Sequence, residues 1–192
     1  MENILFDYLS KYIQLSADEK MAIIDLDIFK QYKKETILLK EGQNSDNGYF
    51  VIKGCIRCYY IINGEEKTTN FYTEAEALEP VCKVNKKPSE YFVSSVEDSI
   101  IIVANSKMEK MIYEKFPKFE TLCRVLSADL LAKNQSSFDE FKTSTPEQRY
   151  LNLLKNRPNL IQRVPQYQLA SYLGLTPQSL SRIKTRLTEK KQ

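Results

Sequence analysis

The chain of 192 residues contains no histidine. This absence excludes haem held by histidine, histidine-ligated zinc, and catalytic pairs of serine or cysteine with histidine. It also removes the commonest general base, and the sequence shows no phosphate-binding loop, paired-carboxylate site or nucleophile beside a base. We therefore do not expect an enzyme, and no cofactor is indicated.

Cysteine is also scarce, with four residues. Cys55 and Cys58 have the spacing of a metal or redox motif, but they fall in a predicted strand, where residues three apart point to opposite faces. They therefore cannot share a metal ion or form a disulfide without breaking the strand. With Cys82 and Cys123 isolated, we expect buried structural thiols and no metal site. The alternative is a redox switch at Cys82, in a polar loop beside Lys83.

Long apolar runs are absent as well. No segment approaches the roughly 20 apolar residues that cross a bilayer. The first residues, MENILFDYLSKYIQ, lack the basic start and apolar core of a signal peptide. We therefore expect a cytoplasmic protein with no membrane partner. Its length and 42% hydrophobic content suit one domain of about 100 to 150 residues and a second, smaller one.

Residues 164–191 predict two short amphipathic helices joined by a tight turn. Gly174 suits the left-handed residue that ends the first helix, Thr176 can cap the second, and Pro177 suits its first position. Apolar residues on one face of each helix are Leu169, Ala170 and Leu173 in the first, and Leu180, Ile183 and Leu187 in the second. This is the outline of a helix-turn-helix, and double-stranded DNA is the expected partner.

The solvent side of the second helix is rich in side chains that can reach bases and phosphates from a major groove. Arg182 is the best candidate for reading a base, with Gln178 and Ser179 beside it. The candidates for contacts to the DNA backbone are Thr176, Ser181, Lys184, Arg186, Arg163 and Gln168. The alternative is an ordinary helical hairpin with a polar exposed face.

The distribution of charge favours DNA. Residues 144–192 contain nine basic and two acidic side chains, although the whole chain is nearly balanced. Residues 1–143 are correspondingly acidic. A basic C-terminal segment beside an acidic body is typical of a nucleic-acid-binding module joined to a part with another task. A solvated basic face without a partner is the other interpretation.

Upstream, short β-branched and aromatic segments follow a helical start at residues 2–30, where Ser16 and Glu19 form a predicted capping box. Asn63-Gly64 is a strong hairpin signal. The expected strands are ETILLK (35–40), GYFVIKG (48–54), CIRCYYII (55–62), EKTTNFY (66–72), YFVSSV (91–96) and SIIIVA (99–104). Several short strands at this spacing indicate a β-roll or barrel.

The string ASYLGLTPQSLSRIKTRL resembles the C-terminal helix-turn-helix of the Crp/Fnr superfamily of bacterial transcription regulators. The series Gln178-Ser179-Leu180-Ser181-Arg182 matches the recognition helix of that family in order. The resemblance implies an α+β fold: an N-terminal double-stranded β-helix (jelly roll) with flanking helices, a long dimerisation helix and a C-terminal winged helix-turn-helix. It also implies a division into a cyclic-nucleotide-binding-like domain (1–116), a dimerisation helix (117–143) and a DNA-binding domain (144–192).

No glycine or proline interrupts residues 118–141, which as a helix would span about 36 Å. Its apolar stripe is Phe119, Leu122, Leu126 and Leu130. By the resemblance this helix pairs with its twofold mate in a homodimer; the alternative is a helix buried within its own monomer. Two recognition helices related by a dyad should read an inverted repeat.

The segment FYTEAEALEPVCKVNKKPSEYF departs from the cassette with which cyclic-AMP-binding members of the family hold the phosphate. It has no glycine or arginine, although such a site usually needs a close backbone approach and a fixed cation. We therefore predict that cyclic AMP does not bind or binds weakly. An unknown small-molecule effector remains open, and the candidate pocket residues are Glu74, Glu76, Ser89 and Tyr91.

Two function classes follow from the sequence. The first is a dimeric transcription regulator that binds a specific DNA sequence and has a degenerate or repurposed sensor domain. The second is an effector-binding or protein-interaction module whose basic C-terminal domain binds a protein. The salt dependence of binding separates the two, because contacts to DNA phosphates weaken steeply with added salt.

Overall fold

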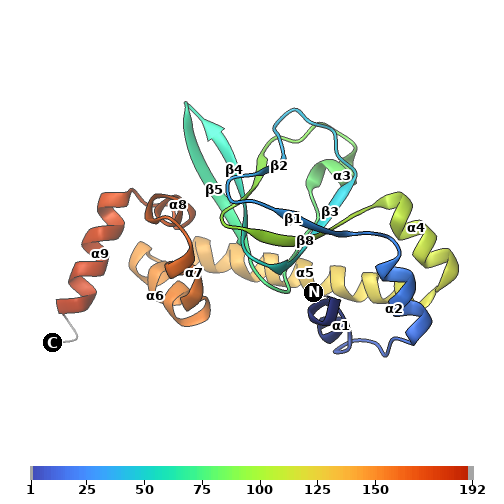
Figure 1. The fold of residues 1–192 in the computed structure, drawn as a ribbon. Helices are drawn as coiled ribbons and strands as arrows, with labels where there is room; N and C mark the ends of the chain where they lie inside the picture. The colour runs from blue at the N-terminus through green and yellow to red at the C-terminus, as the bar shows by residue number, and fades with distance from the viewer. Residues whose placement is uncertain (1, 190–192) are drawn as a thin grey trace.

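A computed structural model describes residues 2–189 of the chain (Figure 1). Two antiparallel four-stranded sheets form its β domain, with strand orders β1-β8-β3-β6 and β2-β7-β4-β5. The strands are β1 (Phe29–Tyr32), β2 (Ile37–Leu39), β3 (Asn47–Lys53), β4 (Ile56–Ile62), β5 (Glu65–Tyr72), β6 (Ala77–Leu78), β7 (Phe92–Ser95) and β8 (Ser99–Asn105). Strands from both sheets contribute to one buried core that includes Leu39, Val51, Ile56, Val93 and Ile101.

The hairpin between β4 and β5 forms where the sequence predicts it. Asn63 and Gly64 both have positive φ, at 53° and 80°, and Ile62 faces Glu65 across the turn. A two-residue turn with positive φ matches the right-handed twist of the flanking strands. The hairpin projects from the β domain beside the C-terminal helices (Figure 1).

The N-terminal segment is less helical than the sequence predicts. It forms α1 (Glu2–Leu9) and α2 (Ala17–Ile24), and the predicted capping box at Ser16 is confirmed, with Glu19 N–H donating to the Ser16 hydroxyl at 3.3 Å. Residues 29 and 30, expected in a helix, belong instead to β1, which pairs with β8. Strand β6 was also not predicted. Both strands are short, and pairing with neighbours distant in sequence overrides their local propensity.

Helix α3 (Val81–Asn85) replaces the polar loop that the sequence suggested around Cys82. Cys82 is 3% exposed, and its thiol lies 3.7 Å from the Ser45 carbonyl oxygen. Lys83 is buried beside it. The polar loop assumed by the redox alternative is therefore wrong, because Cys82 lies on a helix and packs in the core of the β domain.

Helix α4 (Ser106–Lys115) leads into α5 (Lys118–Thr143), the predicted long helix. Phe119 and Leu122 do not lie on a free dimer face: each is 5% exposed and packs in the cluster that contains side chains of α1 and α2. Leu126 and Leu130 are half-buried. The first turns of α5 therefore follow the alternative interpretation, burial within the monomer. Among the described helices, none is both long and apolar enough to span a membrane.

The second half of α5 is exposed. Leu131 is 71% and Phe138 57% exposed. The two side chains are seven residues apart and therefore lie on the same face of the helix. Large apolar side chains exposed on one helix face are typical of an interaction surface. The exposed apolar surface of α5, available for contact with a second copy, therefore lies closer to the C-terminus of the helix than the predicted stripe.

Four helices follow α5: α6 (Pro146–Asn156), α7 (Pro158–Arg163), α8 (Gln166–Tyr172) and α9 (Pro177–Glu189). Residues 144–189 contain no strand, so the wing of the predicted winged helix-turn-helix is absent from the described part of this domain. The short helix α7 lies between α6 and α8. The core of these helices also contains Cys55, Phe71 and Val96 of the β domain.

Candidate nucleic-acid interface

The local sequence explains the turn between α8 and α9. Gly174 has φ of +70° and ends α8, and the Thr176 hydroxyl accepts a hydrogen bond from Ser179 N–H at 3.1 Å at the start of α9. The predicted inward faces are confirmed, since Leu169, Ala170 and Leu180 are at most 1% exposed. This packing fixes the outward face of α9.

The outward face of α9 contains the residues predicted to contact DNA. Exposed side chains on this face are Gln178, Ser181, Arg182, Thr185 and Arg186. Within the described residues, Arg182 makes no hydrogen bond or ion pair, so its guanidinium is available to a partner. Arg186 is less free, because it pairs with Glu147 of α6.

The remaining predicted contacts on α9 are partly engaged within the domain. The Ser179 hydroxyl accepts a hydrogen bond from the Thr176 hydroxyl at 3.0 Å. The Lys184 ammonium lies 6.0 Å from the centroid of the Tyr150 ring and is half-buried. These contacts help to hold α9 in place, and the same side chains also present polar groups to solvent.

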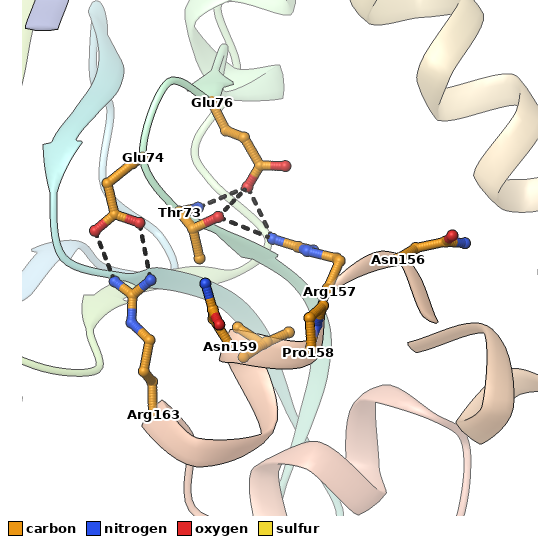
Figure 2. A pocket seen from close by; sticks show the side chains of 9 residues that line it. Thr73, Glu74, Glu76, Asn156, Arg157, Pro158, Asn159 and Arg163 are labelled. Atoms are coloured by element: carbon orange, nitrogen blue, oxygen red, sulfur yellow. Dashed lines mark hydrogen bonds and ion pairs between the residues drawn. The ribbon is translucent and has the colours of Figure 1, made fainter. Parts of the chain in front are cut away.

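Two of the predicted contacts to the DNA backbone lie elsewhere. Gln168 is 7% exposed, so its side chain faces the domain interior. Arg163 forms an ion pair with Glu74 at 2.8 Å (Figure 2). It also pairs with Glu97 at 2.5 Å and donates to the Gly54 carbonyl oxygen at 2.7 Å. The structure therefore corrects the prediction: Gln168 is buried, and Arg163 is paired with carboxylates of the β domain.

The charges and hydrogen bonds around Arg163 stabilise the ionised forms of both Arg163 and Glu74. Hydrogen bonds to Glu74 and then to Glu97 raise the pKa of Arg163 above its ordinary value, although partial burial opposes them. Burial by itself would raise the pKa of Glu74, but hydrogen bonds from Arg163 and from Gly54 N–H outweigh it and lower the pKa. The pair therefore stays charged at neutral pH.

A second ion pair lies beside the first. Arg157 Nη2 is 2.8 Å from Glu76 and 3.1 Å from the Phe71 carbonyl oxygen. The same Glu76 oxygen accepts from Thr73 N–H at 2.6 Å. The two ion pairs line a pocket of about 260 Å³ between the β domain and the C-terminal helices (Figure 2).

The four residues predicted to line an effector pocket therefore do not lie together. Glu74 and Glu76 line the pocket between the two parts of the chain. Tyr91 lines a different pocket, of about 320 Å³, formed by the β domain and Asn134 of α5. Ser89 lines neither, and its hydroxyl donates to the Tyr91 carbonyl oxygen at 2.8 Å.

The pocket of the β domain, hereafter the barrel pocket, is lined by neutral polar and aromatic side chains and one carboxylate. Its lining is Cys58, Tyr60, Thr69, Asn70, Tyr72, Leu78, Glu79, Val81, Tyr91 and Asn134. Burial raises the pKa of Cys58 to about 12 and that of Tyr91 to about 12, so both stay protonated at neutral pH. The lining contains no lysine or arginine and therefore offers no positive charge.

Lys83 and Lys86, near this pocket in sequence, are engaged by carboxylates. Lys83 is 5% exposed and lies 2.8 Å from Glu79 and 2.5 Å from Glu109. Burial by itself lowers the pKa of Lys83, but the hydrogen bonds to Glu109 and Glu79 outweigh it and raise the pKa. Lys86 pairs with Asp46 at 2.8 Å. Neither ammonium group lines the barrel pocket.

The cysteines do not form a site. Cys55 directly precedes β4, outside the strand in which the sequence placed it, and Cys58 lies within β4; both are buried and belong to different core clusters. Burial raises the pKa of each thiol to about 12. Among the described residues, no group of three or more cysteine, aspartate or glutamate side chains could hold a metal ion.

The chain therefore combines a two-sheet β domain, a long helix and a pair of helices with an exposed basic face. Residues 29–115 match the cyclic nucleotide-binding domain family. No curated protein matches the chain at a significant level.

Solved structures are similar along most of the chain. FixK2 from Bradyrhizobium japonicum is 16% identical, with a TM-score of 0.66 and 84% of each chain covered. CLP, a c-di-GMP responsive global regulator from Xanthomonas campestris, is 14% identical, with a TM-score of 0.68, covering 91% of this chain and 93% of CLP. A CooA mutant from Carboxydothermus hydrogenoformans is 18% identical, with a TM-score of 0.63, covering 84% of this chain and 76% of that chain. These similarities establish the fold.

The residues of the barrel pocket do not fit the ligand that the matched family name implies. A cyclic nucleotide brings a phosphate anion, and burying an anion requires a paired cation and hydrogen-bond donors. The lining contains no lysine or arginine, and Glu79 adds a negative charge. Arg57 and Lys83, the buried cations next to this lining in sequence, are already paired with carboxylates: Arg57 with Glu66, and Lys83 with Glu79 and Glu109.

Sequence reasoning missed Arg157 and Ser171 as interface residues. Arg157 is 81 positions from Glu76, and the Ser171 hydroxyl is 103 positions from its donor, Thr68 N–H. No local motif encodes contacts at such separations. The available signal was the opposite charge of the two parts of the chain, which is consistent with contact between them as well as with DNA binding.

Proposed function

We propose that this protein is a transcription regulator of the Crp/Fnr type that binds a specific DNA sequence. The observation that carries the proposal is the outward face of α9, where Arg182 is exposed and unpaired after a well-formed turn. A guanidinium on a helix of this kind can pair with both acceptors of a guanine edge in the major groove. The similarity to the c-di-GMP responsive global regulator CLP supports a regulatory role.

We propose further that the protein acts as a homodimer on an inverted repeat. Leu131 and Phe138, on the exposed half of α5, offer the apolar surface for pairing. A twofold axis beside α5 would relate two copies of α9, and such pairs read half-sites about one helical turn apart. Apart from the β4–β5 hairpin, successive strands alternate between the two sheets, and this pattern supports the double-stranded β-helix description of the β domain.

Cyclic AMP is not the proposed effector. The lack of a cation in the barrel pocket supports this, because a phosphate buried there would be uncompensated. Titration calorimetry with cyclic AMP should give no binding heat. A saturable signal at micromolar cyclic AMP would contradict this part of the proposal.

The first experiment is a selection of sequences from a random DNA pool by the purified protein without added ligand. An inverted repeat is the expected result. Arg182→Ala should lose about 1–3 kcal/mol of discrimination at one base pair of each half-site. Lys107→Ala, which removes one exposed positive charge from α4, is the matched control and should select the wild-type repeat.

The alternative function is an interaction module whose basic helices bind a protein. If the wild-type chain retains no DNA even at low salt, this alternative replaces the DNA-binding proposal. Motif-free binding that weakens steeply with salt would contradict sequence-specific recognition by the chain on its own, because phosphate contacts alone produce that behaviour.

A further inference from the structure

The loop between β5 and β6, residues 73–76, holds the C-terminal helices against the β domain. We propose that Glu74 and Glu76 on this loop form a clasp that positions the DNA-binding helices. Arg163 and Arg157, which the clasp holds, are then positioning residues for operator binding. This inference rests on the proposed function and adds to it a fixed orientation of the reading helices in the free protein.

The first half of the clasp is a two-pronged pair. Arg163 Nη1 and Nη2 each lie 2.8 Å from a different oxygen of Glu74 (Figure 2). Such a paired geometry restricts orientation as well as distance, so it specifies how the two parts of the chain meet. Glu97 accepts from Arg163 Nε at 2.9 Å and thereby fixes the remaining edge of the guanidinium.

Gly54 completes this half of the clasp. Its N–H donates to Glu74 at 2.8 Å, and its carbonyl oxygen accepts from Arg163 at 2.7 Å. The backbone has φ of +105°, and a Cβ here would lie 2.2 Å from the Ser99 hydroxyl oxygen. Only glycine can therefore hold the chain in this turn without displacing Ser99.

The clasp is reinforced by an apolar seam. Phe71 of β5 is 1% exposed, and its ring lies edge-on to Tyr172 of α8, with centroids 5.3 Å apart. The Ser171 hydroxyl accepts from Thr68 N–H at 2.9 Å and lies 3.3 Å from the Glu66 carbonyl oxygen. Domains move freely by default unless their interface is well packed and apolar, and this interface contains a continuous buried cluster.

Contact of the C-terminal helices with the β domain, hereafter docking, leaves the outward face of α9 free. In Figure 1, α8 lies between β5 and α9, so α9 faces away from the β domain. Arg182 and Gln178 remain exposed in this arrangement. Docking therefore fixes the direction in which α9 points and does not cover it. A helix pair that is already oriented does not lose orientational freedom when it binds a twofold operator.

The test compares the double variant Glu74→Gln/Glu76→Gln with Glu41→Gln/Glu90→Gln in the full-length protein. The control pair lies on exposed positions of the β domain and changes the net charge equally. Both variants should therefore gain the same long-range attraction to DNA. The two readouts are hydrogen exchange of the backbone amides of α7 and α8 without DNA, and affinity for the operator selected by the wild-type protein and for random DNA.

The clasp variant should lose protection in α7 and α8, and the control should not. If its docked fraction falls to about one tenth, its operator affinity should fall about tenfold relative to the control. Its affinity for random DNA should equal that of the control. Operator affinity equal to that of the control overturns the positioning role, and tighter binding shows instead that docking is inhibitory.

The exchange readout also separates this inference from the proposed function. Unchanged protection in the clasp variant overturns the clasp, whether or not the wild-type protein selects an operator. If the wild-type protein selects no DNA, both the proposed function and the positioning role fail, while loss of protection in the variant would still establish that the carboxylates dock the helices.

Discussion

Replacing Phe71 by alanine should detach the C-terminal helices from the β domain more than it weakens the β domain itself. Phe71 belongs to β5, but its side chain is 1% exposed within the cluster formed mainly by α6–α9. Truncation of a fully buried phenylalanine costs about 3–5 kcal/mol. Most of this loss should fall on the interface, because the lost contacts include the ring of Tyr172.

Hydrogen exchange followed by mass spectrometry is the assay, because it reports local opening of each helix. A loss of about 3 kcal/mol in the docking free energy should speed exchange in α8 by about 100-fold, since each 1.4 kcal/mol is tenfold. Amides of β3 and β8, which belong to the other sheet, should change much less. Urea unfolding measured by circular dichroism would give the total loss of stability.

The matched control is Phe92→Ala, on β7 of the same sheet. Phe92 is half-buried, stacks on Tyr59 with centroids 5.1 Å apart, and lies outside the cluster that contains Phe71. It should lower total stability by about half as much, because less surface is buried, and leave α8 protected. Wild-type protection of α8 in the Phe71→Ala protein would refute the claim that this ring joins the two parts of the chain.

Three further results are expected. Because the pKa of Glu74 is lowered in the folded state, its stabilising effect is present above the ordinary pKa of about 4.3 and is lost as pH falls through the lowered value. The melting temperature of the wild type should therefore fall more steeply below about pH 4 than that of Glu74→Gln; parallel curves would contradict this. Cys55 and Cys58 should resist a thiol reagent at about pH 8 until the protein unfolds, since burial raises both pKa values to about 12, and rapid native labelling would show that the sites open. Leu131→Glu should convert the proposed dimer to a monomer by light scattering, whereas Val84→Glu, equally exposed at 71%, should not.

The sequence was sufficient for the parts of the structure that depend on local chemistry. Gly174, Thr176 and Pro177 determine a turn within a few residues, so the helix pair and its outward face could be predicted. Asn63-Gly64 likewise specified one hairpin. The identity of the side chains at the exposed face of α9 followed from helical periodicity alone.

What the sequence could not supply was the partner of each surface. An apolar stripe such as Phe119 and Leu122 predicts burial, but not whether a second copy or the same chain buries it. A cation such as Arg163 suits a phosphate and a carboxylate equally, and Glu74 lies 89 positions away. The sequence could not identify these partners, because periodicity and charge describe one surface at a time, whereas contacts at large separation depend on the complete fold.

The hydrogen bonds of Ser171 have a consequence for solubility. Strand β5 is at the edge of its sheet, and Ser171 of α8 engages the Thr68 N–H and the Glu66 carbonyl that no neighbouring strand pairs. An uncovered strand edge is a template for pairing with other chains. The C-terminal helices thus also cap the sheet. Any state in which they separate from the β domain exposes a strand edge and the ring of Phe71 together, so long-lived opening would favour strand-to-strand association between molecules.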